Sequence, residues 1–125
     1  MSLEGKYYQM CSAHWEADSA TFHLRLLPQC EVYRGHFPGR PVCPGACNIE
    51  VLRACFTHWM GRRQYIGAIK QCRMLAVLTP DIDADIEVRI NVLGETAGGC
   101  QISATLSAAG KTYLEFKGEM LRELA

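Results

Sequence analysis

Hydrophobic and polar residues alternate most regularly in the second half of the chain. In the stretch IEVRINV, residues 86–92, an aliphatic residue takes every second position, and Glu87, Arg89 and Asn91 stand between them. A period of two predicts a strand with one face buried and the other in solvent. Turns rich in glycine or containing proline separate this strand from its neighbours, so this half is predicted to be all β. The predicted strands are 65–75, 84–94, 98–110 and 111–121.

In the first half of the chain two further strands are predicted, followed by a segment without regular secondary structure. Residues 7–16 and 20–27 are rich in aromatic and β-branched residues, which favour strands. A turn and a short third extended piece are predicted within 28–33. The stretch RGHFPGRPVCPG, which begins at residue 34, holds repeated glycines and prolines, which exclude regular structure until Pro44.

One helix is predicted from Pro44 to about Gly61, because proline suits the first turn of a helix and glycine suits its end. Its apolar side chains cover so much of the cylinder that other structure is expected to enclose it. They are Ile49, Leu52, Phe56, Trp59 and Met60, extended by Val51, Ala54 and Cys55. The order of elements predicts one α+β domain over residues 1–125, with an antiparallel sheet of about five to six strands wrapped around one central helix. Such a sheet leaves edge strands exposed, which favours pairing with a second copy.

Composition narrows the classes of function. The formal net charge of the 125 residues is zero, so the chain as a whole has no electrostatic attraction to nucleic acid or to an anionic membrane. No apolar run approaches the ~20 residues of a membrane span, and the first ten residues lack a signal-peptide core, which predicts a cytoplasmic protein. The seven cysteines are scattered without metal-ligand spacing. They are expected to be reduced and mostly buried, and no metal site is predicted.

Charge is nevertheless concentrated between residues 34 and 73. This segment holds seven arginines and lysines against Glu50 alone, a net charge of +6. Most such clusters are a solvated helix face with charged loop ends, which is the favoured interpretation here; the alternative is a landing patch for an acidic partner.

Residues 34–50 also hold candidate chemistry. His36, set among glycines and a proline, suits a base near neutral pH, although a histidine beside a turn also serves as a hydrogen-bonding tether. Glu50 on the predicted helix could be an acid, or it could form an i,i+3 ion pair with Arg53. Gly45 at the helix start would let a substrate approach unpaired backbone N–H groups. Together these groups suit removal of a proton α to a thioester and loss of a β-hydroxyl.

The stretch GHFPGRPVCPG, with Glu50 fourteen positions after His36, resembles the signature of the 3-hydroxyacyl-[acyl carrier protein] dehydratases of fatty-acid synthesis, a hot-dog-fold family. The resemblance implies a hydro-lyase that converts a 3-hydroxyacyl thioester to the trans-2-enoyl thioester, in fatty-acid or related acyl-chain synthesis. It implies that His36 is the catalytic base, Glu50 the acid that handles the departing hydroxyl, and Gly45 the donor to the thioester carbonyl.

The resemblance also implies partners. The substrate would be carried on the phosphopantetheine of an acyl carrier protein, with no dissociable cofactor, and each active site would be shared between the subunits of a homodimer or of a trimer of such dimers. The basic segment then becomes a candidate docking surface for the acidic carrier, formed by Arg34, Arg40, Arg62, Arg63 and Lys70. An acyl pocket is expected beside Phe37, Phe56 and Trp59.

Two departures from the family pattern lie on the predicted helix. Asn48 interrupts a run that is normally apolar, and Ala54 stands where relatives often carry glutamine. These departures keep open an acyl-thioester-binding subunit without turnover. The other alternative is an acyl thioesterase of the same fold, against which His36 in its proline-rich loop argues.

Overall fold

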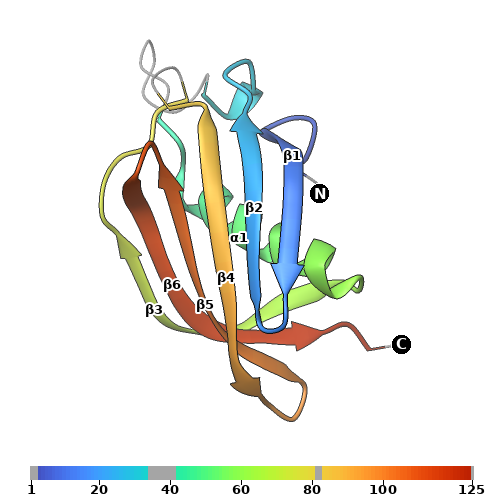
Figure 1. Cartoon of the computed structure of the whole chain (residues 1–125). Coiled ribbons are helices and arrows are strands. Elements are labelled where there is room, and N and C mark those ends of the chain that lie inside the picture. Colours follow the sequence, from blue (N-terminus) through green and yellow to red (C-terminus); the bar gives the residue numbers. More distant parts are fainter. Residues whose placement is uncertain (1–2, 34–41, 81–82, 125) are drawn as a thin grey trace.

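A computed structural model describes residues 3–33, 42–80 and 83–124 of the chain. The predicted order of two strands, one α-helix and four strands is confirmed (Figure 1). The elements are β1 (Tyr8–Glu16), β2 (Ser19–Leu26), a 3-10 helix η1 (Glu31–Tyr33), α1 (Gly45–Met60), β3 (Gln64–Met74), β4 (Asp85–Glu95), β5 (Gly99–Ala108) and β6 (Lys111–Arg122).

The strands form one antiparallel sheet in the order β1-β2-β4-β5-β6-β3, and α1 lies against one of its faces (Figure 1). The register aligns inward-facing residues into rows across the sheet. In one row Phe22 pairs with Val88, Val88 with Leu106, and Leu106 with Leu114, and all four side chains are buried. This is the predicted α+β architecture of a sheet around a central helix. The alternation in β4 places Ile86, Val88 and Ile90 in the core.

The helix begins after Pro44 and ends before Gly61, as these two residues indicated in the sequence. Pro44 caps its start with an extended backbone, and Gly61 ends it in the left-handed conformation, with φ of 70°. The buried face consists of Asn48, Val51, Leu52, Cys55 and Phe56. The predicted placement of Met60 on this face is wrong: as the last residue of the helix it is 37% exposed. In the described part of the chain, no helix is long and apolar enough to span a membrane.

The turn predicted within residues 28–33 is confirmed, but the extended piece predicted with it is wrong. The chain forms the 3-10 helix η1 instead, in which the N–H of Tyr33 donates to the carbonyl of Cys30 at 3.2 Å. Pro28 lacks a backbone donor for a strand ladder, and the turn directs Tyr33 into the core, where its ring centroid lies 6.0 Å from that of Tyr7.

Strand β3 is one edge of the sheet, and several of its large apolar side chains are exposed to solvent. Tyr65, Ile69 and Met74 are 40%, 50% and 53% exposed, although large apolar side chains on a monomer are mostly covered. Two irregularities interrupt its register with β6. The opposite edge, β1, contains one irregularity between Met10 and Ser12.

Candidate active site

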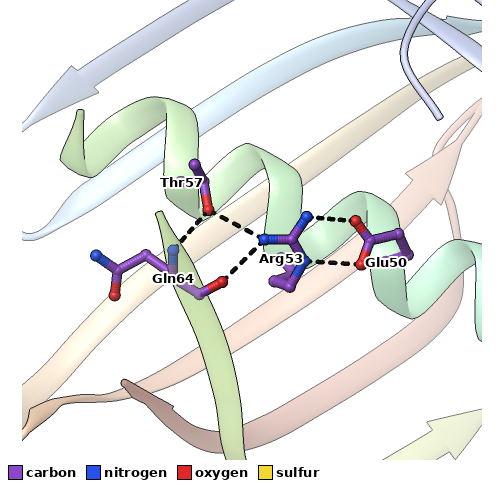
Figure 2. A network of polar contacts seen from close by, with 4 residues as sticks. All are labelled: Glu50, Arg53, Thr57 and Gln64. Atoms are coloured by element: carbon purple, nitrogen blue, oxygen red, sulfur yellow. Dashed lines mark hydrogen bonds and ion pairs between the residues drawn. The ribbon is translucent and has the colours of Figure 1, made fainter. Parts of the chain in front are cut away.

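Glu50 lies on α1 and is held by the arginine one turn further along. The Nε of Arg53 donates to one carboxylate oxygen of Glu50 at 2.7 Å, and its Nη2 donates to the other at 2.5 Å (Figure 2). The i,i+3 ion pair considered from the sequence is therefore present, as a two-pronged contact. This hydrogen bonding raises the pKa of Arg53 above its ordinary value, so its guanidinium is charged at any physiological pH.

Arg53 is itself anchored to the start of β3. Its Nη1 donates to the backbone carbonyl of Gln64 at 2.9 Å and approaches the Thr57 hydroxyl at 3.5 Å (Figure 2). That hydroxyl accepts a hydrogen bond from the Gln64 N–H at 3.0 Å. Gln64 is 1% exposed, so the guanidinium rests on a rigid part of the fold.

The Glu50 carboxylate faces an open cleft of about 610 Å³ between α1 and the first residues of β3. Its side chain remains 30% exposed, so solvent reaches part of it. Ala54 lines the same cleft, and its small side chain leaves space beside the acid. The full lining is Leu3, Glu50, Arg53, Ala54, Thr57, Arg63 and Tyr65.

Gly45, the first residue of α1, lies close under the end of β3. A Cβ built on Gly45 would come within 2.7 Å of the Met74 Cε. The first N–H groups of a helix have no partner within it and carry a partial positive charge. Gly45 precedes Glu50 by five residues, which is ~7.5 Å along the axis and more than a third of a turn around it. In one chain the two residues therefore lie on different sides of the helix.

A buried pair of polar side chains near the start of α1 was not predicted from the sequence. The hydroxyl of Tyr7 donates to the side-chain oxygen of Asn48 at 2.7 Å, which explains how an amide is tolerated on the buried face of α1. Burial raises the pKa of Tyr7 above its ordinary range, so the phenol stays protonated as the donor. Nearby, the Tyr33 hydroxyl and the Cys43 sulfur are 3.5 Å apart. The tyrosine-rich start of the chain and Asn48 were the only sequence signals, and 41 residues separate the partners.

Several predicted site residues lie outside the described residues. These are the base His36, the pocket residue Phe37 and the docking residues Arg34 and Arg40.

The other two predicted pocket residues do not line the Glu50 cleft. Phe56 is fully buried in the core, and its ring stands at 90° to that of Trp59, with 5.8 Å between centroids. Trp59 lines a separate hollow of about 350 Å³ near the end of α1, together with Val92 and Cys100. An acyl pocket beside Phe56 and Trp59 stays a prediction.

The described docking residues are spread along β3 and the turn before it. Arg62 donates to the backbone carbonyl of Glu123 at 2.5 Å, and the Arg63 guanidinium lies 5.1 Å from the Tyr65 ring centroid. Lys70 lies further along β3 and is exposed. Among the described residues, the predicted docking set is therefore an extended strip along β3. Arg62 and Arg63 follow the end of α1, and that end lies ~24 Å from the helix start at Gly45.

Two features bear on metal and disulfide chemistry. No disulfide joins any of the seven cysteines, all of which lie among the described residues. Within residues 3–33, 42–80 and 83–124, no three histidine, cysteine or acidic side chains gather as a metal site would require.

Comparison with known proteins gives a family match over most of the chain. A family model described as ApeI-like, ApeI dehydratase, matches residues 12–112. Curated relatives are named 3-hydroxyacyl-[acyl-carrier-protein] dehydratase FabZ. The protein of Lactiplantibacillus plantarum is 30% identical over 93 residues, which cover 67% of this chain and 63% of that protein. The protein of Levilactobacillus brevis is 39% identical over 57 residues, covering 40% and 38%. The chain thus spans less than two thirds of the length of these relatives.

Solved structures share the fold at low identity. The dehydratase heterocomplex ApeI:P from Xenorhabdus doucetiae has a TM-score of 0.71 at 21% identity, covering 91% of this chain and 97% of that chain. The Escherichia coli PaaI protein from the phenylacetic acid degradation operon has a TM-score of 0.69 at 12% identity, covering 98% and 84%. These likenesses establish the hot-dog fold that the motif implied.

Proposed function

Because the chain belongs to the ApeI-like dehydratase family, we propose that it is a hydro-lyase that converts a 3-hydroxyacyl thioester to the trans-2-enoyl thioester. The observation that carries this proposal is Glu50: it stands fourteen positions after His36 in the family motif, and its carboxylate is fixed at the wall of an open cleft.

Each proposed role accounts for one proton transfer or one developing charge in the reaction. His36 takes the proton from C2, and the electron pair of the broken C2–H bond moves toward the thioester carbonyl. The electron pair then forms the C2=C3 double bond as the C3–O bond breaks, and the hydroxyl leaves as water with a proton from the Glu50 carboxyl group. The backbone N–H at Gly45 stabilises the negative charge that develops on the thioester oxygen. Proton transfer and loss of water require no dissociable cofactor.

We propose that a second copy completes each active site. On one chain Gly45 and Glu50 face different sides of α1, so the oxyanion donor of one subunit and the carboxyl group of the other would serve one substrate. The exposed apolar residues of edge strand β3, and the position of the Glu50 cleft beside that edge, support pairing there. The similar structure from Xenorhabdus doucetiae is a heterocomplex, in which the second chain differs from the first. The mass of the assembly of this protein in solution would show whether its second chain is a copy of itself.

A hydration assay tests the proposed activity. Crotonyl thioester on an acyl carrier protein would be incubated with the protein, and the absorbance of the conjugated enoyl group followed. We expect the absorbance to fall as water adds across the double bond. Release of free thiol instead would indicate a thioesterase, and binding without either signal would indicate a non-catalytic acyl-thioester-binding subunit. Both of these outcomes contradict the proposal.

Gly45→Ala is expected to lower kcat about 10-fold or more while changing the free energy of unfolding by less than ~1 kcal/mol. The added methyl would meet only the flexible end of Met74, which moves at little cost, and alanine favours a helix. The methyl would nevertheless crowd the thioester approach to the helix start. Hydration kinetics and thermal unfolding measure the two effects. A normal kcat would contradict the role of Gly45.

Arg62→Glu with Arg63→Glu is expected to weaken activity on carrier-bound substrate about 10-fold, and activity on a short pantetheine thioester much less. The reason is that only the carrier protein brings an acidic surface to this strip. Lys111→Glu with Lys117→Glu, both on β6, is the control with the same change in charge. Equal losses on the two substrates would contradict docking at Arg62 and Arg63.

A further inference from the structure

We propose that Arg53 is a positioning residue for the reaction: it holds the Glu50 carboxyl group in the orientation that meets the substrate hydroxyl. This inference rests on the proposed function and assigns a role to a residue one turn away from the acid.

The contact between Arg53 and Glu50 is more ordered than a surface ion pair. Two N–H groups of the planar guanidinium meet the two oxygens of the carboxylate, at 2.7 and 2.5 Å. The side chains are 19% and 30% exposed, so solvent screens them less than it screens an exposed pair. A two-pronged contact restricts both the position and the rotation of the carboxylate plane.

The guanidinium is held from its other side by the strand. Its Nη1 donates to the Gln64 carbonyl at 2.9 Å, and Gln64 opens β3 as a nearly fully buried residue. Thr57 completes the support, because its hydroxyl lies 3.5 Å from the same Nη1 and accepts from the Gln64 N–H at 3.0 Å. Figure 2 shows Glu50 on one side of Arg53, and Thr57 and Gln64 on the other. An i,i+3 pair on a free helix face has no such support.

This arrangement suits the proton transfer that the proposed mechanism requires. Each carboxylate oxygen uses one acceptor direction for Arg53, and the second directions remain for the substrate in the cleft. In the hydration direction the carboxylate takes a proton from the water that adds to C3. In dehydration the negative charge that forms on Glu50, as its proton passes to the leaving hydroxyl, develops against two fixed N–H donors.

The test compares variants of Arg53 in the hydration assay. Arg53→Met keeps the length of the side chain and removes its donors; we expect kcat to fall about 10- to 100-fold and KM to change less than about 2-fold. Arg53→Lys keeps the charge and only one donor group, so we expect it to recover part of kcat. Arg25→Met is a control for the loss of an arginine: it removes a single, exposed Arg–Asp contact of 3.2 Å between β2 and β4, and it should leave kcat unchanged.

A second measurement needs no turnover. In the nitrogen NMR spectrum of the unmodified protein, the Arg53 Nε–H should be a resolved, slowly exchanging signal, and Glu50→Gln should shift it strongly. An unchanged kcat in Arg53→Met overturns the role of Arg53 and leaves the proposed function standing. A signal that Glu50→Gln does not move also overturns it. No hydration by the unmodified protein would overturn the proposed function and this inference together.

Discussion

Glu50→Gln is expected to lower the rate of enoyl thioester hydration about 100- to 10,000-fold. Glutamine has nearly the shape of glutamate, but its amide can neither take a proton from water nor return one to a leaving hydroxyl. It also turns an N–H group toward the Arg53 guanidinium, which has no acceptor to offer it. Initial rates with crotonyl carrier thioester measure the effect.

Glu87→Gln is the control for this substitution. Glu87 is also paired with an arginine, Arg89, through a contact of 2.5 Å, and its side chain is 29% exposed against 30% for Glu50. The two glutamates are therefore equally accessible, although Arg89 is 66% exposed against 19% for Arg53, and only Glu50 has an assigned role. A near-normal rate in Glu50→Gln would refute that role.

His36→Ala is expected to lower the same rate by a similar factor, because the proposed reaction then lacks the group that exchanges a proton with C2. His36 lies outside the described residues, so this expectation rests on the motif alone. Loss of activity in Glu50→Gln with retention in His36→Ala would require another base.

The other large expected effect is on folding. Gly99→Ala should destabilise the protein by ~3 kcal/mol or more, because a Cβ at this position would lie 1.7 Å from the backbone oxygen of Met120. Gly99 pairs with Leu121, and a backbone atom in the neighbouring strand cannot turn away as a side chain can. The ladder between β5 and β6 would have to separate locally. Chemical unfolding followed by circular dichroism measures the change.

Gly94→Ala is the matched control in the adjacent strand. A Cβ on Gly94 meets nothing within 4 Å, so the same added methyl is expected to change the free energy of unfolding by less than ~1 kcal/mol. Equal destabilisation by the two substitutions would show that loss of glycine, and not the contact with Met120, is responsible.

Features encoded within a short segment were predicted well. The bounds of α1 follow from Pro44 and Gly61, and the buried face of β4 follows from its period of two. The pairing of Glu50 with Arg53 follows from their spacing of three residues. The motif around His36 indicated the family through its residue types and spacing alone.

Features that join distant segments were not predicted. No local pattern indicates that Tyr7 supplies the donor that Asn48 needs, or that the turn after Pro28 leads into a 3-10 helix instead of an extended piece. The exposed face of β3 likewise depends on its place at the edge of the sheet, beside β6.

The sequence by itself determined the order of the elements, the motif and the acid on the helix. The tertiary structure decided how that acid is held. Periodicity and spacing act through neighbours on one element, so a single sequence displays them. The Glu50 cleft and the anchor of Arg53 on Gln64 form only when β3 packs beside α1. No residue type indicates this anchor in the sequence, because the acceptor is a backbone carbonyl that any residue at position 64 would supply.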